Sequence, residues 1–160
     1  MRIGITGHTN LTAATARLVA VAIRDALAQH AGTDLVGVTC LARGADQIFA
    51  REVLDSGGTL EVVLPAADYR DRKVKPTNAA DFDYLLGRAD TVHTMPFADS
   101  NSQAYMAASE YVLETVDTII AIWDGQPAAG QGGTADVVEA AHHRAIPTTI
   151  IWPQGSARDK

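Results

Sequence analysis

The sequence predicts one α/β domain, a Rossmann-like, doubly wound parallel sheet with helices on both faces. Two observations lead to this fold class. Strand-like and helix-like segments alternate along nearly the whole chain, which is the order of repeated β-α-β units. The strand-like segments are also continuously apolar, as expected for strands buried on both faces, and right-handed crossovers then give the doubly wound arrangement. We assign residues 1–153 to this domain and expect a disordered tail over residues 154–160.

The first half of the chain contains three predicted strands and two predicted helices. The first strand ends at Gly7, and Thr9 or Asn10 is the expected cap of the next helix. Apolar positions of that helix recur at helical spacing: Val19, Ile23, Ala26, Leu27 and His30. Gly32 closes this helix. The predicted elements of this half are strands at Ile3–Thr6, Leu35–Thr39 and Leu60–Leu64, the helix that ends before Gly32, and a helix from about Asp46 to Leu54.

The second half opens with a segment without clear periodicity, from Ala66 to Asn78. A loop of this length inside a compact domain favours a functional lid. Ser100 or Asn101 is the expected cap of the long helix that follows. The later predicted elements are helices at Phe82–Arg88, Asn101–Thr115 and Gly133–His143, and strands at Thr91–Thr94, Asp117–Trp123 and Pro147–Trp152.

Composition limits the classes of function. Apolar residues make up 47% of the 160 residues and charged residues 20%, which is ordinary for a soluble globular protein. Neither a membrane-span pattern nor a signal-peptide pattern is present, and the lone Cys40 fits a reducing compartment, so we expect a cytoplasmic protein. The net charge of −6 predicts that nucleic acid is an unlikely partner. Without metal-ligand spacing or a cofactor motif, we predict neither a metal nor a cofactor.

A glycine-rich loop follows the apolar strand that ends near Trp123. The loop runs from Asp124 to Thr134 and opens a helix, so its backbone N–H groups lie at the positive end of a helix dipole. A phosphate is the usual occupant of such a place. The alternative is an ordinary strand–turn–helix connection. The lysine of a P-loop is missing, because Gln131 and Gly132 stand where Lys and Ser or Thr are required.

Three junctions share the order of strand, small or glycine residues, and helix: Thr6–Asn10, Thr39–Asp46 and Asp124–Thr134. In a parallel sheet all three lie at the same edge, where ligands of doubly wound sheets bind. We therefore predict one composite ligand site. Its candidate residues are Gly7, His8, Thr9, Arg43, Gly44, Asp46, Asp124, Gly125, Gly130, Gly132, Gly133 and Thr134.

Several candidates keep two interpretations. Asp136 and Glu139 are the candidate catalytic residues, because either could bind a ribose hydroxyl or activate water as a general base. Both could equally complement the helix dipole, and Glu139 could pair with His143. Arg43 and Asp46 could clamp a phosphate and a sugar, or form a local surface pair.

Two further features stay open in the same way. The basic segment Arg70, Arg72, Lys73 and Lys75 is either a solvated loop or a positive arm over a phosphorylated ligand. Tyr105 could stack on a base or belong to the core, and His8 could touch ligand or serve the turn.

Three segments together resemble the SLOG superfamily, the Rossmann-like domain shared by the DNA-processing protein DprA and the LOG phosphoribohydrolases. They are Gly4–Asn10, Cys40–Asp46, and Asp117–Trp123 with Gly130–Thr134. The second is similar to the S-G-L-A-x-G-x-D turn of the DprA branch. The third is similar to the P-G-G-x-G-T-x-x-E signature of the LOG branch.

The resemblance implies a nucleotide or phosphorylated-ribose ligand, bound by a sensor or carrier, and a homo-oligomer. It also implies an alternative, hydrolysis of the N-glycosidic bond of nucleoside 5′-monophosphates. The chain departs from the LOG signature at two places. Val137 stands where the signature has its acidic residue, with Asp136 and Glu139 on either side, and Ala107–Ser109 stand roughly where LOG enzymes carry an arginine.

Overall fold

The structure is a computed structural model that describes residues 1–128 and 133–159. Its six strands form one sheet in the order β4-β3-β2-β1-β5-β6, and every neighbouring pair is parallel. The strands are β1 (Arg2–Gly7), β2 (Val36–Thr39), β3 (Thr59–Leu64), β4 (Thr91–Thr94), β5 (Thr118–Ile122) and β6 (Thr148–Ile151). Strand order reverses between β1 and β5, so the topological switch point lies at the ends of these two strands.

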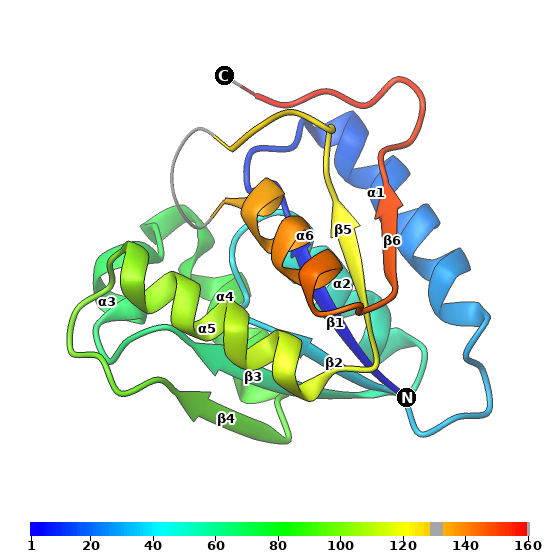
Figure 1. Cartoon of the computed structure of the whole chain (residues 1–160). Helices are drawn as coiled ribbons and strands as arrows, with labels where there is room; N and C mark the ends of the chain where they lie inside the picture. Colours follow the sequence, from blue (N-terminus) through cyan, green and yellow to red (C-terminus); the bar gives the residue numbers. More distant parts are fainter. Residues whose placement is uncertain (129–132, 160) are drawn as a thin grey trace.

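Helices cover both faces of the sheet, which confirms the predicted fold class (Figure 1). The first group, α1, α2 and α4, packs together on one face, and α5 and α6 pack on the other. The helices are α1 (Ala13–Ala28), α2 (Ala45–Asp55), α3 (Tyr69–Lys73), α4 (Ala79–Gly87), α5 (Ser102–Thr115) and α6 (Thr134–His143). No helix of the described residues is long and apolar enough to cross a membrane.

The core explains why the strands are continuously apolar. Ile3 and Ile5 of β1 belong to one buried cluster with Phe49 and Val53 of α2, on the face that α1 and α2 cover. On the other face Val38 and Val63 pack against α5. Both faces of the central strands are therefore removed from water, and apolar side chains are favoured at every position.

Helix starts follow local hydrogen bonding. Asn101 caps α5 as predicted, because its side chain accepts a 2.8 Å hydrogen bond from the N–H of Ala104. The predicted cap of α1 is wrong: Thr12, and not Thr9 or Asn10, accepts from the N–H of Thr15 at 3.1 Å. Before the helix begins, Leu11 pairs with Arg158 and the N–H of Thr12 donates to the carbonyl of Ala157.

The segment from 66 to 78 contains more regular structure than its sequence predicts. It forms α3 and a 3-10 turn at Pro76–Asn78. The side-chain amides of Gln47 and Asn78 exchange two hydrogen bonds of 2.9 Å each, which fix this turn to the start of α2. A segment expected to be an irregular loop is therefore attached to the domain beside the predicted site.

Residues 154–159, expected to be disordered, follow a defined path across the start of α1 (Figure 1). The N–H of Ala157 donates to the buried Thr15 hydroxyl at 2.8 Å, and the N–H of Thr12 donates to the carbonyl of Ala157 at 3.3 Å. Asn10 donates to the carbonyl of Asp159 at 2.6 Å. These contacts hold the segment, hereafter the C-terminal strap (residues 154–159), against the loop after β1.

Candidate functional site

A cavity of about 610 Å³ lies at the carboxyl ends of the central strands. The loops after β1, β2, β3 and β5 all contribute to its walls, together with the first turn of α6. Of the twelve predicted ligand residues, seven line this cavity: Gly7, His8, Thr9, Arg43, Asp46, Gly133 and Thr134. The predicted convergence of three strand exits is therefore present in the structure as one concave site.

Two glycines allow the first two loops to approach closely. A Cβ at Gly7 would lie 2.5 Å from the Cβ of Ala45 and 2.8 Å from that of Ile122. Gly44 has φ +83°, a conformation that favours glycine, and a Cβ there would lie 2.6 Å from the carbonyl oxygen of His8. The N–H of Ala45 donates to that same oxygen at 3.2 Å. Gly44 therefore supports the cavity from behind instead of lining it.

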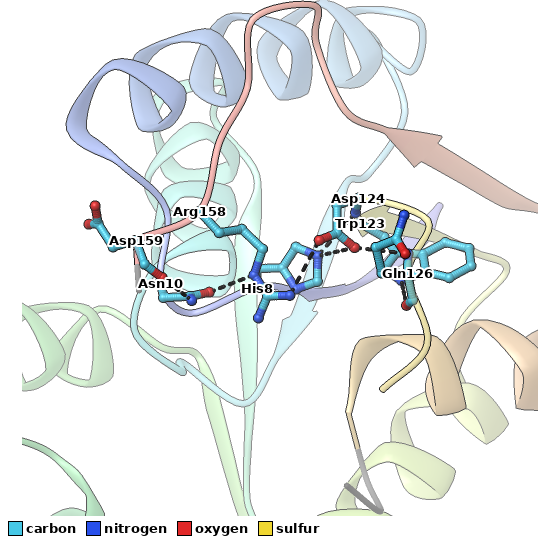
Figure 2. A network of polar contacts seen from close by, with 7 residues as sticks. All are labelled: His8, Asn10, Trp123, Asp124, Gln126, Arg158 and Asp159. Atoms are coloured by element: carbon cyan, nitrogen blue, oxygen red, sulfur yellow. Dashed lines mark hydrogen bonds and ion pairs between the residues drawn. The ribbon is translucent and has the colours of Figure 1, made fainter. Parts of the chain in front are cut away.

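A polar network crosses the switch point between β1 and β5 (Figure 2). The backbone N–H of Asp124 donates to Nε2 of His8 at 3.0 Å. Arg158 of the C-terminal strap donates from Nη1 to Asp124 at 3.3 Å and from Nε to Oδ1 of Asn10 at 2.9 Å. The network therefore joins the ends of both strands to the strap.

His8 is neutral in this network. Burial, and then the positive charge of Arg158, lower the pKa of His8, and Asp124 only partly opposes them. Nε2 also lies 3.2 Å from a carboxylate oxygen of Asp124, a contact that becomes an ion pair only on a protonated ring. Because the lowered pKa favours the neutral ring near neutral pH, Nε2 accepts from the Asp124 N–H and the ring proton resides on Nδ1.

Asp124 completes the turn after β5. Its carboxylate accepts from the N–H of Gln126 at 3.0 Å, while the Trp123 ring N–H donates to the carbonyl of Gln126 at 2.9 Å. Although burial by itself raises the pKa of Asp124, the bond from Gln126 and the nearby His8 and Arg158 hold that pKa below its usual value. Asp124 is therefore an anion whose carboxylate pairs with Arg158 and whose backbone N–H holds the neutral His8 ring.

Asp46 is the buried carboxyl of the cavity. Its side chain accepts from the N–H of Ala42 at 3.3 Å and from Thr39 and Cys40 in the loop after β2. Burial nevertheless raises the pKa of Asp46 to about 7. The surface pair with Arg43 is not formed, since Asp46 is only 6% exposed and bonds to the loop.

Four basic side chains line the cavity: Arg43, Lys73, Lys75 and Arg158. The basic segment has two parts. Arg70 pairs with Asp83 and Arg72 lies near Asp68. Lys73 and Lys75 instead line the cavity. The positive-arm interpretation fits only these two lysines.

Sequence reasoning missed three contributors. Arg158 lies in a segment whose sequence predicts a disordered tail, and no local pattern marks it. Trp123 and Tyr69 also line the cavity, and of these two only Trp123 has a local signal, its position at a strand exit. Tyr105 lines the cavity too and packs edge-on against Tyr69 with ring centres 6.2 Å apart, so it serves both core and cavity.

The two candidate catalytic residues do not line the cavity, although Ala135 and Val137 beside them do. The side chain of Glu139 is 72% exposed and lies 3.7 Å from His143, which matches its alternative interpretation. Gly125 has φ +83° in an open turn and also lies outside the cavity walls. Gly130 and Gly132 lie outside the described residues. Over residues 1–128 and 133–159, no group of three or more His, Cys, Asp or Glu side chains could hold a metal ion.

Comparison with known proteins finds similar structures but no similar sequence family. No protein-family model and no curated protein matches the sequence. DprA from Streptococcus pneumoniae matches with TM-score 0.70 and 18% identity over 96% of this chain and 51% of that protein. The chain thus spans about half the length of that DprA.

Two further structures share the fold. A DprA from Helicobacter pylori, whose structure concerns its single-stranded DNA binding mode, matches with TM-score 0.68 and 16% identity over 99% of this chain and 68% of that protein. The Moco carrier protein of Chlamydomonas rheinhardtii matches with TM-score 0.55 and 17% identity over 93% of this chain and 74% of that one. At identities this low, the likeness of these structures establishes the fold alone.

The prediction that nucleic acid is an unlikely partner is wrong. It rested on the net charge of −6, yet a DprA that binds single-stranded DNA shares this fold along nearly the whole chain. Net charge was the wrong quantity, because binding depends on the local field, and this acidic chain places four cations around one cavity. The cytoplasmic location and the homo-oligomer stay predictions. The Rossmann-like fold that the resemblance to the SLOG superfamily implies is confirmed, and the branch stays open.

Proposed function

We propose that the cavity binds a nucleotide or a phosphorylated ribose and that the protein acts as a sensor or carrier of this ligand. The observation that carries the proposal is the composition of the cavity. Arg43, Lys73, Lys75 and Arg158 line it, and the only carboxyl among its described walls is the buried Asp46. In a concave site between protein walls, such an excess of positive charge attracts anions.

The phosphate is proposed to bind at the start of α6. Gly133 and Thr134 line the cavity, and the first turn of α6 has no side-chain cap among the described residues. The N–H groups of Thr134 and Ala135 and the Thr134 hydroxyl are therefore donors that a phosphate could satisfy. Arg158 reaches the same switch point through Asp124, which follows β5.

The base is proposed to lie against aromatic side chains. Tyr69, Tyr105 and Trp123 line the cavity, and flat rings of this kind stack on bases with little regard to which base is present. Relatives in fold include a carrier and a protein with a single-stranded DNA binding mode. Carrying a cofactor and binding single-stranded DNA both fit a site that holds a nucleotide-like group without transforming it.

Hydrolysis of a nucleoside 5′-monophosphate is the second candidate function, and one observation favours it. A glycosidase needs a carboxylic acid that is protonated near neutral pH, and burial raises the pKa of Asp46 in the cavity to about 7. The loop bonds of Asp46 count against this function, because they turn its oxygens toward Ala42 and its neighbours.

A panel of nucleoside 5′-monophosphates and ribose 5-phosphate tests both candidates. Thermal stabilisation and tryptophan fluorescence report binding, since Trp123 lines the cavity and Trp152 packs edge-on against His8 at 5.6 Å. Chromatography of free base reports hydrolysis. We expect binding without base release, with affinity weakened at least tenfold in Arg158→Gln but not in Arg17→Gln, which changes an exposed α1 residue outside the cavity. Base release that Asp46→Asn abolishes would establish the hydrolase instead, and no response to any compound would overturn the proposal.

A further inference from the structure

We infer that the ligand carries two phosphate groups on opposite sides of its nucleoside, as in a nucleoside 3′,5′-bisphosphate or the 5′-phosphorylated end of a strand. The inference rests on the proposed nucleotide function and names the class of nucleotide. It follows from positive charge in the cavity that a single phosphate at the start of α6 leaves unused.

The unused charge belongs to three side chains, Arg43, Lys73 and Lys75, hereafter the basic rim. All three are exposed and line the cavity, and none has an ion-pair partner among residues 1–128 and 133–159. The other basic residues of the same segment, Arg70 and Arg72, each lie near a carboxylate. Like charges gathered without counter-charge repel one another, and a bound anion relieves that repulsion.

Local structure holds the basic rim together. Arg43 lies directly before the start of α2, and Lys75 lies directly before the 3-10 turn at Pro76–Asn78. The two reciprocal amide bonds between Gln47 and Asn78 fix that turn to α2. Lys73 ends α3, two residues earlier. The three cations therefore come from two segments that are fastened to each other.

Strand order separates the basic rim from the proposed phosphate position. The rim follows β2 and β3, whereas the start of α6 and Arg158 belong to the exit of β5. In the order β3-β2-β1-β5 the two outer strands are three inter-strand steps apart, roughly 14 Å at the usual spacing of parallel strands. Strand order therefore places the basic rim and the start of α6 toward opposite ends of the cavity.

The two positions also differ in charge. Arg158 at the β5 exit is paired with Asp124 at 3.3 Å and shares that carboxylate with His8. The basic rim has no such neutralising partner in the described chain, and Asp46, the nearest carboxyl of the cavity wall, has its pKa raised to about 7. The rim therefore keeps an uncompensated positive charge that a second phosphate can neutralise, in addition to the phosphate at the helix start with Arg158.

The test compares three compounds with each of the common bases: a nucleoside 5′-monophosphate, a 5′-diphosphate and a 3′,5′-bisphosphate. The diphosphate is the control for total charge, because its two phosphates are adjacent. Calorimetric titration of the full chain should give at least tenfold tighter binding of the bisphosphate than of either other compound. The double variant Lys73→Gln/Lys75→Gln should abolish this preference, so that the bisphosphate and the diphosphate bind the variant with affinities within twofold of each other. Arg72→Gln, which changes an exposed basic residue outside the cavity, should keep it.

A 5′-phosphorylated trinucleotide distinguishes the two sources of such a ligand. Tighter binding of the trinucleotide than of the bisphosphate assigns the site to a strand end, and the reverse assigns it to a free bisphosphate. Equal binding of mono- and bisphosphates, or a preference that survives the double lysine variant, would overturn the inference and leave the proposed function standing. Failure of every nucleotide to bind the unaltered protein would instead overturn the proposed function, and the inference with it.

Discussion

His8 and Asp124, which are 116 positions apart, are joined by a 3.0 Å hydrogen bond from the Asp124 N–H to Nε2 of His8. His8 follows β1 and Asp124 follows β5, so this bond spans the place where strand order reverses. Arg158 of the C-terminal strap contacts the carboxylate of Asp124, so its positive charge acts on the His8 ring. The charge around His8 and Asp124 at the switch point therefore depends on a segment from the far end of the sequence.

Arg158→Gln is expected to raise the pKa of His8. Burial is the largest cause that lowers this pKa and the charge of Arg158 is the second, so removing the charge leaves Asp124 to act with less opposition. The pKa should move upward, toward or beyond the usual 6.5 of a histidine. Titration of the His8 ring protons by NMR measures the shift, and Arg17→Gln on exposed α1 is the control. A fall or no change would contradict the network described for Asp124.

Asn10→Ala is expected to release the C-terminal strap. The Asn10 amide donates to the carbonyl of Asp159 at 2.6 Å and accepts from Nε of Arg158 at 2.9 Å. Loss of both bonds should speed amide hydrogen exchange at Arg158 and Asp159 at least tenfold, because short segments with few contacts open locally. Gln103→Ala, at an exposed position of α5, should leave that exchange unchanged. Unaltered exchange in Asn10→Ala would mean that the hydrogen bonds of Ala157 with the Thr12 N–H and the Thr15 hydroxyl suffice to hold the strap.

Gly7→Ala is expected to destabilise the domain by about 1–3 kcal/mol, the usual cost of overpacking. The new methyl group would lie 2.5 Å from the Cβ of Ala45 and 2.8 Å from that of Ile122, so β1 and α2 would have to separate. Gly87→Ala is the matched control, since a Cβ there meets nothing within 4 Å. Urea unfolding measures both, and the control should be neutral or up to about 1 kcal/mol more stable. Equal stability of the two variants would show that the loops after β1 and β2 can move apart freely.

Asp46 is expected to make stability fall as pH rises. Its folded-state pKa is raised from 3.8 to about 7, so the folded chain holds this proton over a pH range in which the unfolded chain has released it. The contribution is fully present below about pH 4 and is lost as pH rises through about 7, by up to about 4 kcal/mol. The free energy of unfolding is measured for the unaltered protein and for Asp46→Asn from about pH 4 to 8. As pH rises, the value for the unaltered protein should fall relative to that for Asp46→Asn. A constant difference between them would show that Asp46 is ionised throughout.

The strands and helices could be predicted because their signals are local. Continuous apolar runs such as Ile119–Ile122 are buried wherever they fold, and helical spacing in Val19, Ile23 and Leu27 fixes which face of α1 packs inward. Parallel pairing then places the ends of β1, β2 and β5 at one edge. Seven candidate ligand residues line one cavity for this reason.

The rest depended on contacts that local sequence does not encode. Glu139 and Arg158 are both charged residues near structural boundaries, yet Glu139 faces solvent on α6 whereas Arg158 lines the cavity. The outcome for Arg158 depends on Thr15 and Asn10, more than 140 positions away, which hold the strap in place. Likewise the bonds between Asn78 and Gln47 hold the turn that follows Lys75 against α2, and both Lys75 and Arg43 line the cavity.

The sequence by itself determined the doubly wound sheet and the edge where the cavity lies, because burial and periodicity act over a few residues and parallel pairing brings the strand ends together. The tertiary structure decided which charges meet at that edge. A polar side chain near a strand exit can turn to solvent or to the cavity at little local cost, and only long-range packing selects between the two. That selection placed Lys73, Lys75 and Arg158 in the cavity wall and left Glu139 outside it.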